Sequence, residues 1–227
     1  MRTLPHPALH EPTPINPPLS TLPNPLPLFP LRTVLFPGAL LGLKVFETRY
    51  LDLMSECLRQ GTPFGVVCLS QGVELGRGRD VDAATQLEEV GVLVRIDDID
   101  AEQAGILNVR CTGTQRFRRV GRPGQRDNGL WQSQAELIAD DPPRAPGPAV
   151  ASTVAALAEA ITKLKEHDKE PFAAPYRLDD AGWVANRWCE LLPVSLAAKQ
   201  KLMALDDPVI RLSLVDGFLR DKKVVVG

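Results

Sequence analysis

Ser195 and Lys199 stand four residues apart, a spacing that resembles a nucleophile beside a base. Nucleophilic catalysis needs a hydroxyl or thiol held next to a group that accepts its proton. Ser195, however, closely follows a proline, at a position typical of a serine that caps the start of a helix. The imidazoles that could act as a base are those of His6, His10 and His167. They lie in proline-rich or helix-end surroundings that do not position them, so the sequence predicts a protein that is not an enzyme.

Metal-ligating patterns are also missing. The four cysteines contain no CxxC pair, and each lies among apolar residues, which predicts buried free thiols: Cys57, Cys68, Cys111 and Cys189. Acidic residues 97–102 lack the glycine and the glutamate of a calcium-binding loop, so a solvated turn is predicted there. The glycine-rich residues 72–79 lack the spacing of a phosphate-binding loop and predict a hairpin loop. No metal and no cofactor is expected.

Arginines concentrate in one short stretch: Arg116, Arg118, Arg119 and Arg122, followed by Arg126. Such a cluster could contact RNA or another anion. Proteins that bind single strands usually pair this charge with several stacking aromatic residues, and aromatics make up only 5% of this chain. A solvated, ion-paired strand edge is therefore favoured, and nucleic-acid contact by these arginines is the less favoured alternative.

The overall composition is that of an ordinary globular protein. The chain has 227 residues, with 26 Lys+Arg against 28 Asp+Glu and 44% hydrophobic residues. The near-balance of charge argues against a global attraction to nucleic acid or anionic lipid. The prolines of the first residues leave no apolar stretch of signal-peptide length, and no run is long enough to span a bilayer. A cytoplasmic protein without a membrane partner is expected.

Prolines divide the chain into parts. Ten of them fall within residues 1–30, so residues 1–24 are predicted to be an extended tail. A second proline-rich stretch, residues 141–148, is predicted to be a linker between two subdomains. The expected organisation is a β-rich subdomain at 25–140, the linker, a helical subdomain at 149–221 and a short C-terminal tail at 222–227.

Hydrophobic periodicity changes across the linker. Before it, period-two alternation or short apolar runs predict strands at 64–69, 90–97, 106–111, 116–120 and 131–138. One helix is predicted around residues 50–58, with Gly61 ending it. After the linker, the period of 3.6 predicts four helices: one over 150–164, one from Asp179 or Asp180, one capped by Ser195 and one starting at Asp207 and Pro208. The pattern indicates a compact, barrel-like antiparallel sheet followed by a helical bundle.

One stretch is more specific than these patterns. Residues 26–38 read LPLFPLRTVLFPG and are followed by FETRY at 46–50. Further blocks follow in order: FGVV at 64–67, VGVLVRI at 90–96, Gly113 with RFR at 116–118, LLPV at 191–194 and KQKL at 199–202. Together they resemble the N-terminal, substrate-recognition domain of ATP-dependent Lon proteases, over about residues 25–220. Gly42 and Thr48 depart from the family pattern, which would have proline at both positions, and Thr48 could cap the following helix.

The resemblance implies an α+β fold, a PUA-like antiparallel pseudo-barrel with one inserted helix, followed by a C-terminal helical bundle. It also implies a recognition module alone, because neither an ATPase nor a peptidase module follows in the sequence. We therefore expect binding of unfolded protein or peptide segments, with an adaptor role beside a separate ATP-dependent protease as one form of this function. The residues expected to line an apolar groove between barrel and bundle are Leu31, Phe36, Phe46 and Tyr50. Two alternatives remain: RNA binding by the barrel and the arginine cluster, and a small-molecule site in the barrel–bundle cleft.

Overall fold

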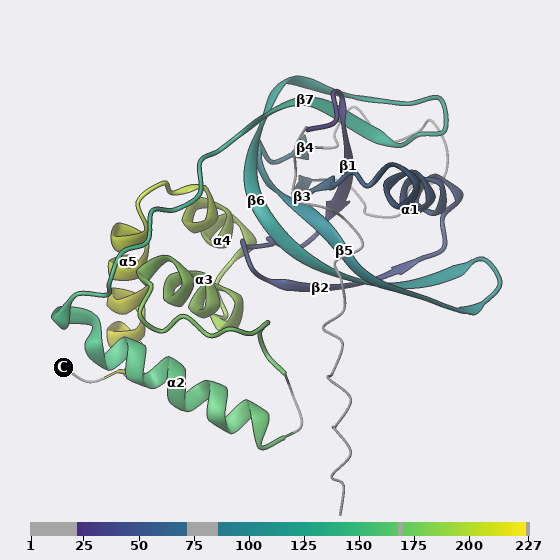
Figure 1. Ribbon diagram of the computed structural model, residues 1–227. Helices are drawn as coiled ribbons and strands as arrows, with labels where there is room; N and C mark the ends of the chain where they lie inside the picture. Colours follow the sequence, from purple (N-terminus) through teal and green to yellow (C-terminus); the bar gives the residue numbers. More distant parts are fainter. Residues whose placement is uncertain (1–21, 72–85, 168–169, 226–227) are drawn as a thin grey trace, which may run out of the picture.

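The computed structural model describes residues 22–71, 86–167 and 170–225, and Figure 1 shows a β-rich part beside a helical part. The strands of the β-rich part are β1 (Leu26–Leu31), β2 (Leu40–Val45), β3 (Phe64–Gln71), β4 (Gln86–Leu87), β5 (Val90–Gln103), β6 (Ile106–Gln125) and β7 (Trp131–Leu137). A single helix, α1 (Thr48–Gln60), is inserted between β2 and β3. It ends at Gly61, which adopts the left-handed conformation (φ 64°) that glycine tolerates best.

The strand pairings form a closed circuit. β1 pairs with β7, β7 with β6, β6 with β5, β5 with β3, and β3 returns to β1. The β1–β3 pairing is parallel, whereas the other four are antiparallel. β2 lies outside this circuit and pairs with the first half of β6. The predicted pseudo-barrel is therefore confirmed, with one parallel contact that the sequence pattern does not indicate.

The helical part follows an extended segment and a short 3₁₀ turn (Pro148–Val150). Its helices are α2 (Ala151–Lys165), α3 (Ala181–Leu191), α4 (Leu196–Ala204) and α5 (Pro208–Asp221). The predicted caps are confirmed: Ser195 Oγ accepts from the amide of Ala198 at 3.2 Å, and Asp207 Oδ1 accepts from two amides at the start of α5. The Ser195 hydroxyl thus caps a helix, as its position after a proline predicts.

Several local predictions are wrong. The acidic residues 97–102 continue β5 and do not form a turn, because Asp97 and Asp98 pair with Arg95 and Arg110. The two strands predicted at 106–111 and 116–120 are one strand, β6, whose ladder with β5 is interrupted by bulges. Thr48 does not cap α1, because the residue before the helix is Glu47. The glycine-rich residues 72–79 lie outside the described part of the chain.

Buried arginines hold the two parts together. Arg187 of α3 is 0% exposed and donates hydrogen bonds to the carbonyl oxygens of Pro37 and Gly38, each at 2.8 Å. Arg116 of β6, 4% exposed, donates to the carbonyls at the end of α4 and to Asp141. Arg211 of α5 also bonds Asp141, at 2.6 Å. Arg187 and Arg116 each bond acceptors on the opposite part, and Asp141 of the connecting segment bonds both Arg116 and Arg211, so the seam has one specific geometry.

Candidate functional site

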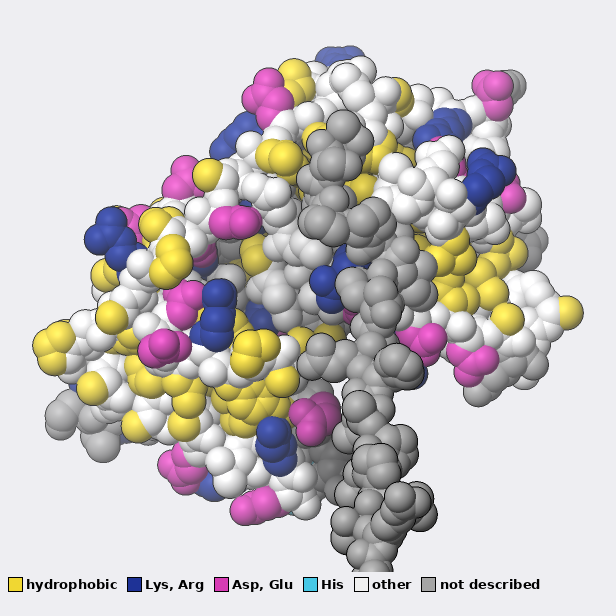
Figure 2. All heavy atoms as spheres, in the orientation of Figure 1, with side chains coloured by type: hydrophobic (Ala, Val, Ile, Leu, Met, Phe, Trp, Pro, Cys, Tyr) yellow, Lys and Arg dark blue, Asp and Glu magenta, His cyan; other side chains and the backbone are white. Residues whose placement is uncertain are grey.

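A pocket of about 280 Å³ opens between β1, β2 and the start of α1. It is lined by Phe29, Pro30, Leu31, Gly42, Leu43, Lys44, Val45, Phe46, Glu47 and Tyr50. The rings of Phe29 and Tyr50 stack with their centroids 4.1 Å apart. The side chain of Phe46 is 50% exposed, which is unusual for an aromatic ring. Figure 2 shows further apolar side chains gathered over the end of β2 and the β5–β6 hairpin. The pocket is therefore an open, largely apolar hollow.

The structure brings together three of the four residues predicted to line a groove. Leu31, Phe46 and Tyr50 line this pocket, whereas Phe36 is 0% exposed and belongs to the core. The pocket lies within the β-rich part, not between barrel and bundle where the sequence predicts the groove. Phe36 is drawn inward because it precedes a tight turn at Pro37 and Gly38, whose carbonyls are bound by Arg187.

The wall of the pocket contains one unusual polar group. Glu47 Oε2 pairs with Arg49 Nη2 at 2.7 Å, and the Arg49 guanidinium lies 4.8 Å from the centre of the Tyr50 ring. The other carboxylate oxygen, Glu47 Oε1, is buried and has no hydrogen-bond partner. A buried acceptor without a donor is costly.

The rim of the pocket is an open strand edge. Among the described residues, β2 pairs only with β6. The amide of Gly113 donates to the carbonyl of Ala39 at 2.9 Å, so residue 39 is a hydrogen-bonded position of this antiparallel ladder. Because such positions alternate, Leu40, Gly42 and Lys44 direct their amides and carbonyls away from β6. A Cβ atom on Gly42 would meet nothing within 4 Å, so the middle of this edge is bare backbone.

The sequence does not identify this edge. The only sequence feature there is the short apolar run at residues 39–43. It has no clear alternation of apolar and polar residues that would indicate a strand with one exposed face. Gly42, which departs from the family pattern, lies at its centre. Glu47 is likewise visible only as part of the FETRY block, and nothing in the sequence indicates an unpartnered carboxylate oxygen.

The arginines predicted for RNA or anion contact do not form one surface. Arg116 is buried in the seam, and burial lowers its pKa. Arg118 pairs with Glu89 at 2.7 Å, and Arg119 donates to backbone carbonyls at residues 87 and 88. Arg122 is exposed. Three of the four guanidinium groups are thus engaged within the protein.

The cleft between the β-rich and helical parts has a different chemistry. Its volume is about 420 Å³, and its charged lining residues include Arg116, Asp141, Arg177 and Asp180. These four are paired within the protein: Arg116 with Asp141 at 2.9 Å, and Arg177 with Asp180 at 3.1 Å. The cleft is therefore polar, with these four charges paired and Asp140 as a further carboxylate, unlike the apolar pocket beside β2.

Ser195 and Lys199, the pair that resembles a nucleophile beside a base, each have another partner in the structure. Lys199 Nζ donates to the carbonyl of Glu190 at 3.1 Å, while the Ser195 hydroxyl is occupied as a cap. In residues 22–71, 86–167 and 170–225, no group of three His, Cys, Asp or Glu side chains could hold a metal ion. No helix in those ranges is long and apolar enough to cross a membrane.

The four cysteines are free and buried, as predicted. Burial raises the pKa of Cys57, Cys111 and Cys189 to about 12. At pH 8 only about one such thiol in ten thousand is ionised, and the thiolate is the reactive form. We therefore expect an aromatic disulfide reagent to label none of these thiols in the folded protein and all of them in denaturant. Rapid labelling of the folded protein would contradict this burial.

Comparison with known proteins identifies the family of this chain. Residues 25–221 match the family model of the ATP-dependent protease La (LON) substrate-binding domain. The chain therefore belongs to the LON substrate-binding domain family, which confirms the resemblance seen in the sequence. The matched domain is the non-catalytic, substrate-binding part of such proteases.

Solved structures agree. A crystal structure of a Lon N-terminal domain protein from Xanthomonas campestris is 35% identical, with a TM-score of 0.67, and the match covers 85% of this chain and 97% of that one. The N-terminal domain of Mycobacterium avium complex Lon protease has a TM-score of 0.57 at 14% identity, covering 86% of this chain and 98% of that one, and so shares the fold. No curated protein sequence matches the chain.

Proposed function

We propose that this protein binds extended, apolar segments of polypeptide at the pocket between β1 and β2. The observation that carries the proposal is the exposed ring of Phe46 beside a pocket whose rim is a strand edge that no described residue pairs with. Family membership supports the binding of protein substrates as a class. An unfolded chain has free backbone amides and carbonyls that can hydrogen-bond to the edge of β2. It also has apolar side chains that can fill the pocket.

The binding mode follows from the geometry of β2. An extended segment would add beside β2 and hydrogen-bond to the outward amides and carbonyls of Leu40, Gly42 and Lys44. Alternate side chains of a strand point to opposite faces, so every second residue of the segment would face the pocket. There it would contact Phe46 and Tyr50. Backbone pairing tolerates many sequences, and the apolar hollow selects those with a large apolar residue.

The test is to replace Phe46 with serine and to measure binding of fluorescent apolar peptides by anisotropy. Losing contact with a half-exposed aromatic side chain removes about 1.5 kcal/mol, so we expect about tenfold weaker binding. Leu137→Ser is the matched control, because Leu137 is 47% exposed but lies on β7. An equal loss in both variants, or none in Phe46→Ser, would contradict the proposed site.

A backbone variant separates strand addition from filling of the pocket. Gly42→Pro removes an outward amide without disturbing the ladder to β6, and its side chain has free space. Weaker binding in this variant supports strand addition. Unchanged binding in Gly42→Pro together with a loss in Phe46→Ser would assign affinity to the pocket alone.

We also propose that this binding serves protein quality control in the cytoplasm, with the protein delivering its clients to a separate ATP-dependent protease. The family supports this role, since its domain recognises substrates for such an enzyme. RNA binding through Arg116, Arg118, Arg119 and Arg122 stays a prediction, and the engagement of three of these side chains does not favour it.

A further inference from the structure

The outward face of α5 is apolar. The exposed positions of this helix are Val209, Ile210, Ser213, Leu214, Gly217 and Asp221. Ile210 and Leu214 are 52% and 55% exposed, and Val209 is 42% exposed. A helix on the surface normally presents charged and polar side chains to water. Here the only charged residue among the exposed positions is the last one, so this face has the character of an interface.

Two small residues shape the middle of this face. Ser213 and Gly217 are four residues apart and therefore adjacent on one side of the helix. A Cβ atom on Gly217 would meet nothing within 4 Å. Ile210 and Leu214 stand beside these two positions, so the face combines protruding apolar side chains with a shallow groove. Such a surface lets another helix approach closely.

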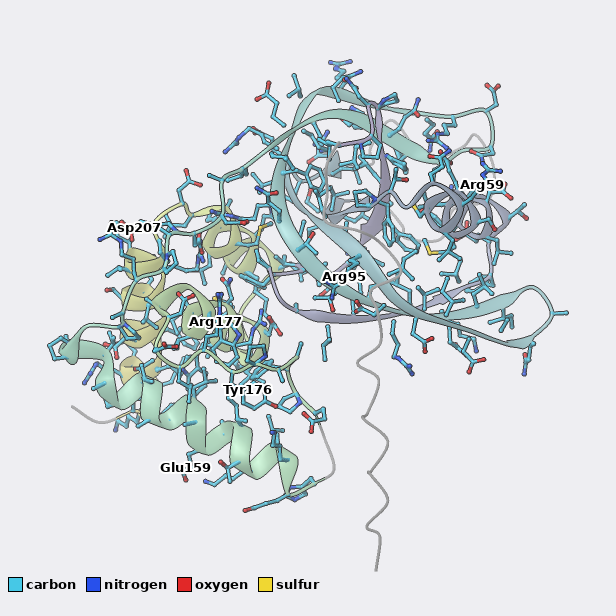
Figure 3. All side chains as sticks on the ribbon, in the orientation of Figure 1. Arg59, Arg95, Glu159, Tyr176, Arg177 and Asp207 are labelled. Atoms are coloured by element: carbon cyan, nitrogen blue, oxygen red, sulfur yellow. The ribbon has the colours of Figure 1, made fainter. Side chains whose placement is uncertain are left out.

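Charge differs between the two ends of α5. Asp206 and Asp207 precede the helix, and Figure 3 labels Asp207 at that end. Lys222 and Lys223 follow the helix and are exposed, and they outweigh Asp221. The helix dipole has the opposite sense, but it is equivalent to only about half a unit charge at each end. The net side-chain charge at each end is larger, so the face has an acidic end and a basic end, with apolar residues between.

We propose that this face binds the same face of a second copy of the chain, with the two α5 helices antiparallel about a two-fold axis. An antiparallel arrangement brings the acidic end of each helix beside the basic end of the other, whereas a parallel one would place like charges together. With Asp206 opposite Lys223 of the second copy, Leu214 falls over Ser213 and Gly217 of that copy. The face is thus complementary to itself, as a two-fold interface requires.

The size of the α5 face determines how tightly two copies of the chain are expected to bind. A helix of 14 residues is about 21 Å long, and one helix pair buries less than the about 1,200 Å² typical of stable complexes. We therefore expect a reversible dimer with a dissociation constant on the order of 10–100 µM. α5 lies at the outer edge of the helical part, whereas β2 and α1 lie in the β-rich part (Figure 1). Both peptide pockets stay open in such a dimer.

Sedimentation velocity over about 5–500 µM tests the proposal. The mass should rise from 24.8 kDa towards twice that value in this concentration range. Leu214→Glu should stay monomeric throughout, while Leu137→Glu, a matched exposed leucine on β7, should behave as the unmodified chain. A chain that is monomeric at every concentration, or a dimer that Leu214→Glu leaves intact, overturns the proposal.

Charge reversal tests the antiparallel orientation. Lys223→Asp should weaken the dimer several-fold, and Asp206→Lys in the same chain should restore it, because the pair is then reversed in both contacts. Asp206 also lies 3.6 Å from Arg116 of the seam, so circular dichroism melting of each variant checks that the seam and the helical part stay folded. If the double variant dimerises more weakly than Lys223→Asp alone, the antiparallel arrangement is overturned.

Discussion

Replacing Arg187 with methionine will lower the free energy of unfolding by about 3–5 kcal/mol, as expected when one member of a buried ion pair is removed. The guanidinium is 0% exposed, pairs with Glu190 at 2.5 Å and binds the carbonyls of Pro37 and Gly38. Methionine fills similar space but leaves two carbonyls and a carboxylate without their donor. Urea denaturation followed by tryptophan fluorescence measures this loss.

The effect of this substitution will depend on pH through Glu190. Burial raises the pKa of Glu190 to about 7, despite the opposing effect of Arg187. A carboxyl whose pKa is raised in the folded state contributes stability at low pH and loses it as pH rises through that pKa. Without Arg187 the buried carboxylate is uncompensated, so the penalty should be largest above pH 7 and should shrink at pH 5.

A surface arginine gives the matched control. Arg177 is 56% exposed and pairs with Asp180, and Figure 3 labels it on the loop before α3. Arg177→Met should change stability by less than about 1 kcal/mol, because exposed ion pairs contribute little. Equal effects of Arg177→Met and Arg187→Met would contradict the assignment of Arg187 as a buried link across the seam.

Gly91→Ala is expected to cost about 3 kcal/mol, since overpacking of this kind forces backbone to move. A Cβ atom at Gly91 of β5 would lie 2.5 Å from the carbonyl oxygen of Val66 and 2.7 Å from the ring of Phe117. The carbonyl belongs to β3, so the two strands must separate. Gly124→Ala on β6 is the control, because a Cβ atom there meets nothing within 4 Å. A loss below about 0.5 kcal/mol in Gly91→Ala would contradict this tight approach.

Local sequence signals predict much of the fold. Ser195 and Asp207 cap helices where the sequence places them, and Gly61 ends α1. Helix caps and helix ends depend on residues that are close together in the sequence, so local sequence patterns predict them. The continuous apolar run at 64–69 also predicts burial on both faces of β3, and Val66 and Val67 indeed pack into different core clusters.

Features that depend on distant residues were not predictable in this way. Arg116 alternates with Phe117 along β6 and would be expected on a solvated face. It is buried because its hydrogen-bond acceptors are the carbonyls of Met203 and Leu205, almost ninety residues further along the chain. The pocket also depends on residues that are distant in the sequence, because Leu31 ends β1 and Phe46 follows β2, and both line it.

The closed circuit of strands has a consequence for biosynthesis. β1 is among the first strands to leave the ribosome, but its antiparallel neighbour β7 contributes Ser133 opposite Leu26. One edge of β1 therefore stays unpaired until β7 has been translated, about a hundred residues after β1. Pairings between such distant strands form slowly, and exposed strand edges attract other chains meanwhile. Under the proposed function, the protein passes during its own translation through a stage in which it resembles the unfolded segments that it would bind.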